Sequence, residues 1–226
     1  MVKEKRNAWI ILGLTLTLCV CMGLVDAVLS PPYAVKSAIK LVLFGAIPVI
    51  FLLCTKSLSP RRLFSLEKKH LALTLPLAGG VFTVIMVAFF ALRGFIDFSS
   101  VTDSVTADAG VTRENFIFVA LYIALVNSLL EEFFFRGFCF FGMLPLGAPF
   151  AYIVSSLMFS AYHVAFMDGW LSPGIFALSL LGMAMGGVIF AFLNHKTKSL
   201  LPSWLVHMAS NLATNLIGII MFYNLL

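Results

Sequence analysis

Long apolar stretches separated by short polar segments dominate the chain. A helix that crosses the hydrocarbon core of a bilayer, about 30 Å thick, needs about twenty apolar residues. Stretches of this kind cover residues 8–29, 35–55, 71–95, 115–143, 148–166, 172–194 and 200–224. The pattern predicts an all-α protein, a polytopic bundle of about seven transmembrane helices. The fourth stretch is long enough to tilt or bend within the membrane.

The composition supports a membrane protein and excludes a soluble domain. Apolar residues make up 61% of the chain and charged residues only 11%, whereas about a quarter of the residues of a soluble domain are charged. In water, such a chain would expose far too much apolar surface. The net charge of +5 does not indicate nucleic-acid binding, because the basic residues lie at predicted helix ends. We therefore expect the lipid bilayer, and no nucleic acid, as a partner.

Lysine and arginine are concentrated in alternate connections between the apolar stretches. They lie at the amino terminus, in the connection 56–69 and near residue 196, as Lys3, Lys5, Arg6, Lys56, Arg61, Arg62, Lys68, Lys69, Lys196 and Lys198. The connection 95–112 holds three aspartates and neither lysine nor arginine, and its residues 99–112 resemble a solvated loop. Positive-inside sorting predicts a cytoplasmic amino terminus and, with seven spans, an external carboxyl terminus. We expect an integral protein of the plasma membrane whose first span is an uncleaved signal anchor.

Small residues in the sixth stretch predict a close helix–helix contact. Gly182 and Gly186 form a G-x-x-x-G pattern, and Gly187 follows directly. Patterns of this kind let two membrane helices approach closely, so we interpret these glycines as packing residues.

Polar side chains inside the spans are the strongest functional signal. An ionisable side chain near the bilayer centre costs about 2.5–3.5 kcal/mol on insertion scales, so it usually faces the interior of the bundle and serves a function. Such residues occur in the fourth, fifth and seventh stretches, as Asn127, Glu131, Glu132, Arg136, His163, His207 and Asn211.

Helix geometry predicts different roles for the two adjacent glutamates. Glu132 and Arg136 are four residues apart, with the acid nearer the amino terminus, which favours an intrahelical ion pair. Glu131 is rotated about 100° from Glu132 and shares a face with Asn127. We therefore interpret Glu132 and Arg136 as a structural pair that leaves Glu131 free for chemistry. His207 and Asn211 likewise share one face of the seventh span.

Structural and catalytic interpretations of these residues both remain open. A buried Glu–Arg pair can simply link helices, and a lone membrane histidine often hydrogen-bonds to a neighbouring helix. A glutamate and two histidines on three spans, however, form a set that both general-base and metal-assisted hydrolysis use.

Three short motifs resemble those of a known protease family. They are Glu131-Glu132-x-x-x-Arg136, Phe159-x-x-x-His163 and His207-x-x-x-Asn211. In this order, each in an apolar span, they resemble the motifs of the CPBP family of intramembrane proteases, which contains the CAAX prenyl endopeptidases and the bacterial Abi proteins linked to bacteriocin processing and self-immunity. The resemblance covers about residues 115–215, and the first three spans match nothing specific.

The resemblance implies a division of the chain and a role for each motif residue. Residues 1–114 would form three amino-terminal spans and a loop, and residues 115–226 a catalytic bundle built from the fourth to the seventh span. Glu131 and His163 would activate a water molecule, with Glu132 and Arg136 in support. His207 and Asn211 would hold the oxyanion, and a side-chain amide can do so without transferring a proton.

The sequence leaves the need for a metal open. Glu131, His163 and His207 could bind zinc and leave one position for water, as in a metalloprotease. No H-E-x-x-H segment is present, so we favour a metal-independent glutamate mechanism and assign no cofactor.

The predicted function is that of an intramembrane endopeptidase acting on a membrane-associated protein or peptide. One alternative is a non-catalytic immunity or scaffold protein that retains the motifs. Another is a small transporter with a proton relay, but the half repeat typical of transporters is not found. A prenylated carboxyl terminus, a double-glycine-type leader and a transmembrane anchor all remain open as substrates.

The spacing of the two histidines raises a geometric difficulty. At 1.5 Å per residue, His163 lies near the outer end of the fifth stretch and His207 about two turns from the inner end of the seventh. They converge only if helices tilt, the fourth span bends, or the fifth helix stops within the membrane. Gly169, Pro173 and Gly174, just beyond His163, favour an early stop.

Overall fold

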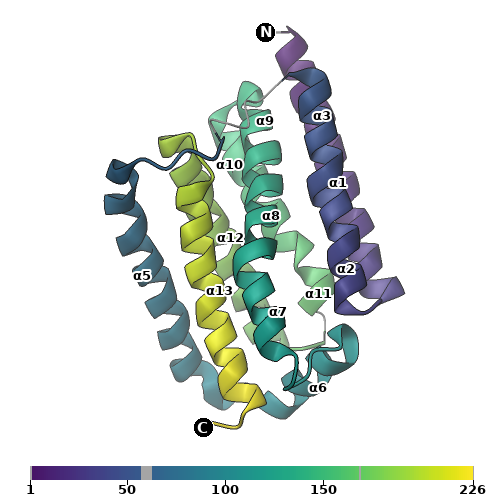
Figure 1. Ribbon diagram of the computed structural model, residues 1–226, viewed down its shortest axis with the longest axis vertical. Coiled ribbons are helices and arrows are strands. Elements are labelled where there is room, and N and C mark those ends of the chain that lie inside the picture. The colour runs from purple at the N-terminus through teal and green to yellow at the C-terminus, as the bar shows by residue number, and fades with distance from the viewer. Residues whose placement is uncertain (1, 57–62, 168, 226) are drawn as a thin grey trace.

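The computed structural model describes residues 2–56, 63–167 and 169–225, and this part of the chain is a helical bundle without a β-strand. Figure 1 shows the long helices running side by side along one axis. Six helical stretches are long and apolar enough to cross a membrane. Together with one shorter apolar helix, they confirm the prediction of an all-α bundle with about seven spans.

The first three spans come from the amino-terminal half of the chain. They are α1 with η1 (Val2–Leu24 and Val25–Leu29), α2 with η2 and α3 (Tyr33–Lys40, Leu41–Ala46 and Ile47–Thr55), and α5 with η3 (Lys68–Leu92 and Arg93–Phe95). The short helix α6 (Phe98–Ala109) follows at the end of the bundle.

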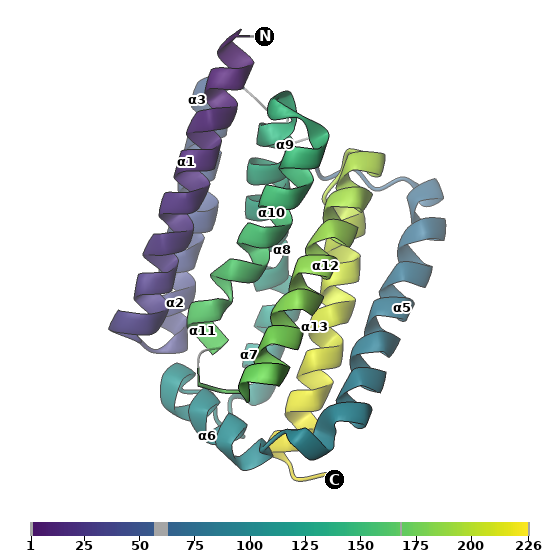
Figure 2. The same ribbon diagram turned by 180° about the vertical axis from the view of Figure 1, so that it is seen from behind.

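The fourth span is one long helical run that lies at the centre of the bundle (Figures 1 and 2). It consists of α7 (Phe116–Tyr122), η4 (Ile123–Asn127), α8 (Ser128–Glu132), η5 (Phe133–Phe140), α9 (Phe141–Met143) and η6 (Leu144–Leu146). The remaining helices are α10 (Ala148–Tyr162), α11 (Val164–Met167), α12 (Pro173–Thr197) and α13 (Leu201–Phe222).

Helix α10 is shorter than the predicted span 148–166. It contains 15 residues and ends at Tyr162, with His163 as its C-cap. Fifteen residues of α-helix measure about 22 Å, less than the thickness of the hydrocarbon core. After α11, the chain turns at Gly169, whose positive φ of 78° suits glycine. The sequence allows three ways in which His163 and His207 could converge. The structure shows one of them, the early end of the fifth helix.

Helix α6 corrects the expectation of a solvated loop over residues 99–112. The Asp97 side chain accepts a hydrogen bond from the Ser100 backbone N–H at 3.1 Å, so it caps the first turn. Gly110, with φ of 64°, ends the helix in the left-handed conformation. The serine- and threonine-rich composition suggested a loop, but the two capping signals at its ends determine the helix.

The basic connections gather at one end of the bundle. The amino terminus, the connection before α5 and the turn between α12 and α13 lie together, opposite α6 and the carboxyl terminus (Figures 1 and 2). The Leu63 carbonyl accepts hydrogen bonds from Leu200 N at 2.7 Å and Ser199 Oγ at 3.1 Å. Arg61 and Arg62 lie outside the described residues. Arg93 in η3 and Arg113, which lies over the Tyr223 ring, are at the opposite end, and the orientation itself stays a prediction.

Aromatic side chains fill the core around the central run. Phe44 on η2 stacks on Phe134 with ring centroids 3.9 Å apart, and its ring edge meets Phe135. All three rings are fully buried, which joins the second span to the fourth. Helices α1 to α3 lie on one side of the central run, and α13 with the peripheral α5 on the other (Figures 1 and 2).

The predicted close helix contact is made by Gly187. A Cβ added there would lie 2.9 Å from the Ser156 Cα of α10, too close for any side chain. A Cβ on Gly182 would meet nothing within 4 Å. The glycine that permits the approach of α12 to α10 is thus the one after the G-x-x-x-G pair.

Candidate active site

The central helix carries its two glutamates between two π-helical segments. The α-helical segment α8 is flanked by η4 and η5, and such wider turns are frequent at functional sites. Within α8 the ordinary rotation of about 100° per residue holds. Glu131 and Glu132 therefore point to different neighbours, as the sequence predicted.

Glu131 is buried and held by one oxygen. Its Oε1 accepts hydrogen bonds from Lys40 Nζ at 2.5 Å and from Asn127 Nδ2 at 3.0 Å. The bond to Asn127 agrees with the predicted shared face. The ion pair with Lys40 is a contact that the motif spacing did not predict. Glu131 Oε2 points the other way and lies 3.5 Å from His207 Nε2.

Glu132 and Arg136 form the predicted ion pair. Arg136 Nη1 lies 3.3 Å from Glu132 Oε1, and both side chains are completely buried. Arg136 Nη2 also donates to the Gly187 carbonyl at 3.3 Å. Its guanidinium lies over the rings of Phe159 and Phe190, 4.4 and 5.0 Å from their centroids. These cation–π contacts offset part of the desolvation of the cation.

His207 lies between the two glutamates. Its Nδ1 is 3.1 Å from Glu132 Oε1, and because an ionised carboxylate only accepts, Nδ1 carries the donated proton. The ring stacks on Phe190 with centroids 4.9 Å apart. Glu132 thus fixes the orientation of His207 in addition to pairing with Arg136, a contact that the spacing of the motifs did not predict.

His163 is half-buried at the carboxyl end of α10. Its Nδ1 donates to the Phe159 carbonyl at 2.6 Å, because a carbonyl can only accept. In the neutral ring this leaves the lone pair on Nε2, which suits a proton acceptor. His163 interacts electrostatically with Glu131, although the contacts of the described residues include no hydrogen bond between them.

The Asn211 side chain hydrogen-bonds to the backbone of the central helix. Its Nδ2 donates to the Ile123 carbonyl at 3.2 Å, and Asn215, one turn further along α13, donates to the Ala120 carbonyl at 2.8 Å. An amide nitrogen has two N–H groups, so Asn211 keeps one donor for another acceptor. Neither Glu131 nor His207 is among the hydrogen-bond partners that the described structure gives Asn211.

Lys40 is a site residue that the motifs did not predict, although the sequence contains a signal for it. Lys40 and Lys36 lie within the predicted span 35–55, and a charge inside an apolar span usually has a partner. Lys36 Nζ lies 3.5 Å from Asp26 Oδ1, and both side chains are buried. Lys36 and Lys40 therefore both take part in buried ion pairs, and the partner of Lys40 is Glu131.

The three proposed metal candidates do not fit a metal ion in this arrangement. Among the described residues, no group of three or more histidine, cysteine, aspartate or glutamate side chains could hold one. Glu131 Oε1 is occupied by the Lys40 ammonium group, which repels a cation.

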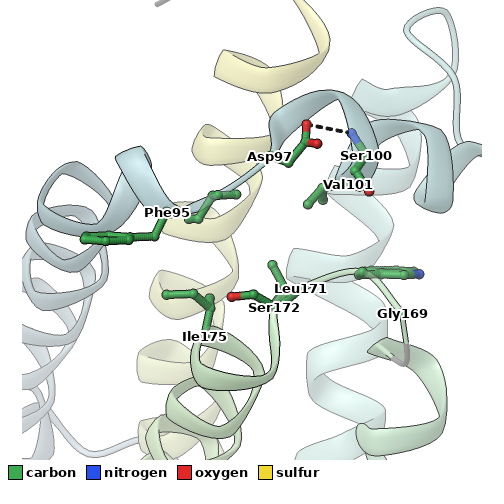
Figure 3. A pocket seen from close by; sticks show the side chains of 10 residues that line it. Phe95, Asp97, Ser100, Val101, Gly169, Leu171, Ser172 and Ile175 are labelled. Atoms are coloured by element: carbon green, nitrogen blue, oxygen red, sulfur yellow. Dashed lines mark hydrogen bonds between the residues drawn. The ribbon is translucent and has the colours of Figure 1, made fainter.

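The residues Lys40, Asn127, Glu131, Glu132, Arg136 and His207 contact one another and form a polar cluster. A cavity of about 240 Å³ lies elsewhere, between the start of α6 and the segment before α12 (Figure 3). Asp97, Ser100 and Trp170 contribute to its lining, with mostly apolar neighbours. Trp170 Nε1 donates to Asp108 Oδ2 at 2.9 Å, which ties the segment before α12 to α6. None of the motif residues lines this cavity.

Comparison with known protein families matches the part of the chain that carries the motifs. Residues 113–213 match the family model described as "Rce1-like: Type II CAAX prenyl endopeptidase Rce1-like". The matched segment contains all three motifs and excludes the first three spans. Neither the curated proteins nor the solved structures that were searched give a match.

Proposed function

We propose that the chain hydrolyses a peptide bond in a membrane-associated protein or peptide. The match of residues 113–213 to the Rce1-like type II CAAX prenyl endopeptidase family model supports a protease of the CAAX type. The observation that carries this proposal is the asymmetry of Glu131. One carboxylate oxygen is fixed by Lys40 and Asn127, and the other faces His207. An oriented, buried carboxylate with one available oxygen suits a general base.

In the proposed reaction, Glu131 Oε2 accepts a proton from a water molecule whose oxygen attacks the scissile carbonyl carbon. His163 Nε2 accepts a hydrogen bond from the same water and so orients it. The C–N bond then breaks, and Glu131 returns the proton to the leaving amine. The single water molecule therefore supplies a hydroxyl group to the new carboxyl terminus and a hydrogen to the new amine.

The oxyanion of the tetrahedral intermediate would be held by His207 and Asn211. Because His207 Nδ1 donates to Glu132, its Nε2 is a donor only in the imidazolium form. The free N–H of Asn211 would supply the second hydrogen bond, and one such donor is worth about 10²–10³ in rate.

We propose a substrate with a prenylated carboxyl terminus, by the name of the matched family. The lipid bilayer would hold the prenyl chain and deliver the peptide to the buried site. The protein would lie in the plasma membrane with its amino terminus in the cytoplasm, following the distribution of lysine and arginine.

A fluorescent peptide with a farnesylated Cys-aliphatic-aliphatic-X terminus tests this function. The purified protein in lipid nanodiscs should cleave it after the modified cysteine, and in ¹⁸O-labelled water the new carboxylate should carry the label. The same peptide without the farnesyl group should be cleaved far more slowly. Equal cleavage of both peptides would contradict the prenylated substrate and leave hydrolysis itself supported.

The ion pair between Lys40 and Glu131 also favours a second candidate, a non-catalytic scaffold such as a bacteriocin immunity protein. In such a protein the pair would serve only to hold α2 to α8. This alternative predicts no ¹⁸O incorporation with any peptide. It also predicts that protection of cells against a bacteriocin survives Glu131→Gln.

A further inference from the structure

Lys40 is a buried cation whose ammonium group lies within the polar cluster. Its Nζ contacts both Glu131 Oε1 at 2.5 Å and Asn127 Oδ1 at 2.6 Å, and the residue is only 5% exposed. The ammonium also lies over the Tyr162 ring, 4.8 Å from its centroid. An ammonium buried in this way retains its charge only with such partners.

Each of the two glutamates in the polar cluster forms an ion pair with a different basic side chain. Arg136 pairs with Glu132 from the same helix, whereas Lys40 reaches Glu131 from α2. The two pairs balance in charge, and His207 lies between them. Other groups that act electrostatically on Glu131 are His163 and His207, and more distant interactions involve Arg136, Tyr33 and Tyr162. Of these neighbours, Lys40 hydrogen-bonds to Glu131 Oε1, whereas His207 Nε2 lies 3.5 Å from the other oxygen, Oε2.

We propose that Lys40 is a positioning residue that keeps Glu131 ionised and confines its Oε1, so that Oε2 is the atom that takes the proton from water. The inference rests on the proposed hydrolytic function. A buried carboxylate without a counter-charge takes up a proton, and a protonated Glu131 cannot act as a base. Lys40 thus supplies a condition for catalysis without touching the reacting atoms.

An infrared measurement tests the ionisation of Glu131 without any reference to activity. The difference spectrum between the wild-type protein and Glu131→Gln at pH 7 should lack the carbonyl band of a protonated carboxylic acid. The same difference between Lys40→Gln and Lys40→Gln/Glu131→Gln should show that band. A protonated Glu131 in the wild-type protein would overturn the inference. This result comes from the comparison of the wild-type protein with Glu131→Gln, so it does not require that a Lys40 variant folds.

The pH profile of cleavage of the farnesylated peptide provides the second readout. For Lys40→Gln, the acid limb of kcat/KM should move upward by about 1–3 pH units, with activity recovering at alkaline pH. Lys40→Arg, which retains the charge, should keep the acid limb of the wild-type protein. An unshifted limb in Lys40→Gln, or a higher activity at pH 7, would overturn the inference, since the latter would mean that Lys40 blocks Glu131.

Lys36 offers a matched control for both measurements. It lies one turn before Lys40 on α2, is equally buried, and pairs with Asp26 instead of Glu131. Lys36→Gln should lower thermal stability but leave the acid limb unchanged. If neither the wild-type protein nor any variant cleaves the peptide, the proposed function fails, while the infrared result still decides whether Lys40 keeps Glu131 ionised.

Discussion

The Nδ1 of His207 lies 3.1 Å from Oε1 of Glu132, the same oxygen that lies 3.3 Å from Arg136 Nη1. One carboxylate therefore links the seventh span to the cation of the fourth span. Glu132 has two functions in this arrangement: it neutralises a fully buried guanidinium, and it fixes which nitrogen of His207 carries the proton. The two functions respond differently to substitution.

Glu132→Gln should lower both stability and activity. Removing one partner of a buried ion pair costs about 3–5 kcal/mol, so the thermal unfolding temperature in detergent should fall clearly. Glu132→Gln/Arg136→Gln should recover much of that stability, because no charge is then unpaired. Cleavage should stay low in the double variant, because His207 still lacks its carboxylate partner. Recovery of both stability and activity together would show that Glu132 serves only as the counter-ion of Arg136.

Asn211→Ala should reduce activity by about 10²–10³, the effect of one lost oxyanion donor. Asn215 provides the control, because it makes the equivalent side-chain hydrogen bond to the Ala120 carbonyl one turn away. Both alanine variants should lose about 0.5–1.5 kcal/mol of stability, the usual contribution of one hydrogen bond. Only Asn211→Ala should lose cleavage. An equal loss of activity in the two variants would assign Asn211 to helix packing alone.

Much of the fold and part of the site could be predicted from the sequence, because they depend on local spacing. Apolar stretches of sufficient length mark the spans, and four-residue spacing on one helix predicts the pairs of Glu132 with Arg136 and of Asn127 with Glu131. Such neighbours follow from the rotation of a helix. They need no knowledge of which helices lie side by side.

Contacts between distant segments could not be derived in this way. Lys40 and Glu131 are 91 residues apart, and His207 and Glu132 are 75 residues apart. Their meeting depends on which helices pack against one another, and local spacing does not determine this. The presence of Lys40 inside an apolar span did indicate a partner, but it did not show which acid. The division of the chain after residue 114 also stays a prediction, although Lys40 joins the two parts.

Chelation should leave cleavage intact. The described residues contain no group of three or more metal-binding side chains, and Glu131 is paired with an ammonium group. After dialysis against a strong chelator, the protein should keep its activity and contain much less than one zinc per chain by elemental analysis. Activity that disappears with a stoichiometric metal, and returns when the metal is restored, would instead indicate a metalloprotease.

Reporter fusions should place the basic end of the bundle in the cytoplasm. Fusions after Lys69 and after Lys198 should report the same, cytoplasmic side, because the connection before α5 binds the turn between α12 and α13. A fusion at Ser104 in α6 should report the external side. An external signal after Lys69 and Lys198 would reverse the orientation, and opposite signals would contradict the arrangement of the helices.

The most direct test of the account is the cleavage rate of a protein that lacks the Glu131 carboxylate but has no unpaired charge. Glu131→Gln alone leaves Lys40 buried without its partner, so a loss of activity could reflect misfolding. Glu131→Gln/Lys40→Gln removes both charges and should unfold near the wild-type temperature. Its cleavage of the farnesylated peptide should be lower by at least about 10²–10⁴, the contribution of a positioned general base. A folded double variant that cleaves within a fewfold of the wild-type rate would contradict the central claim that Glu131 activates the water.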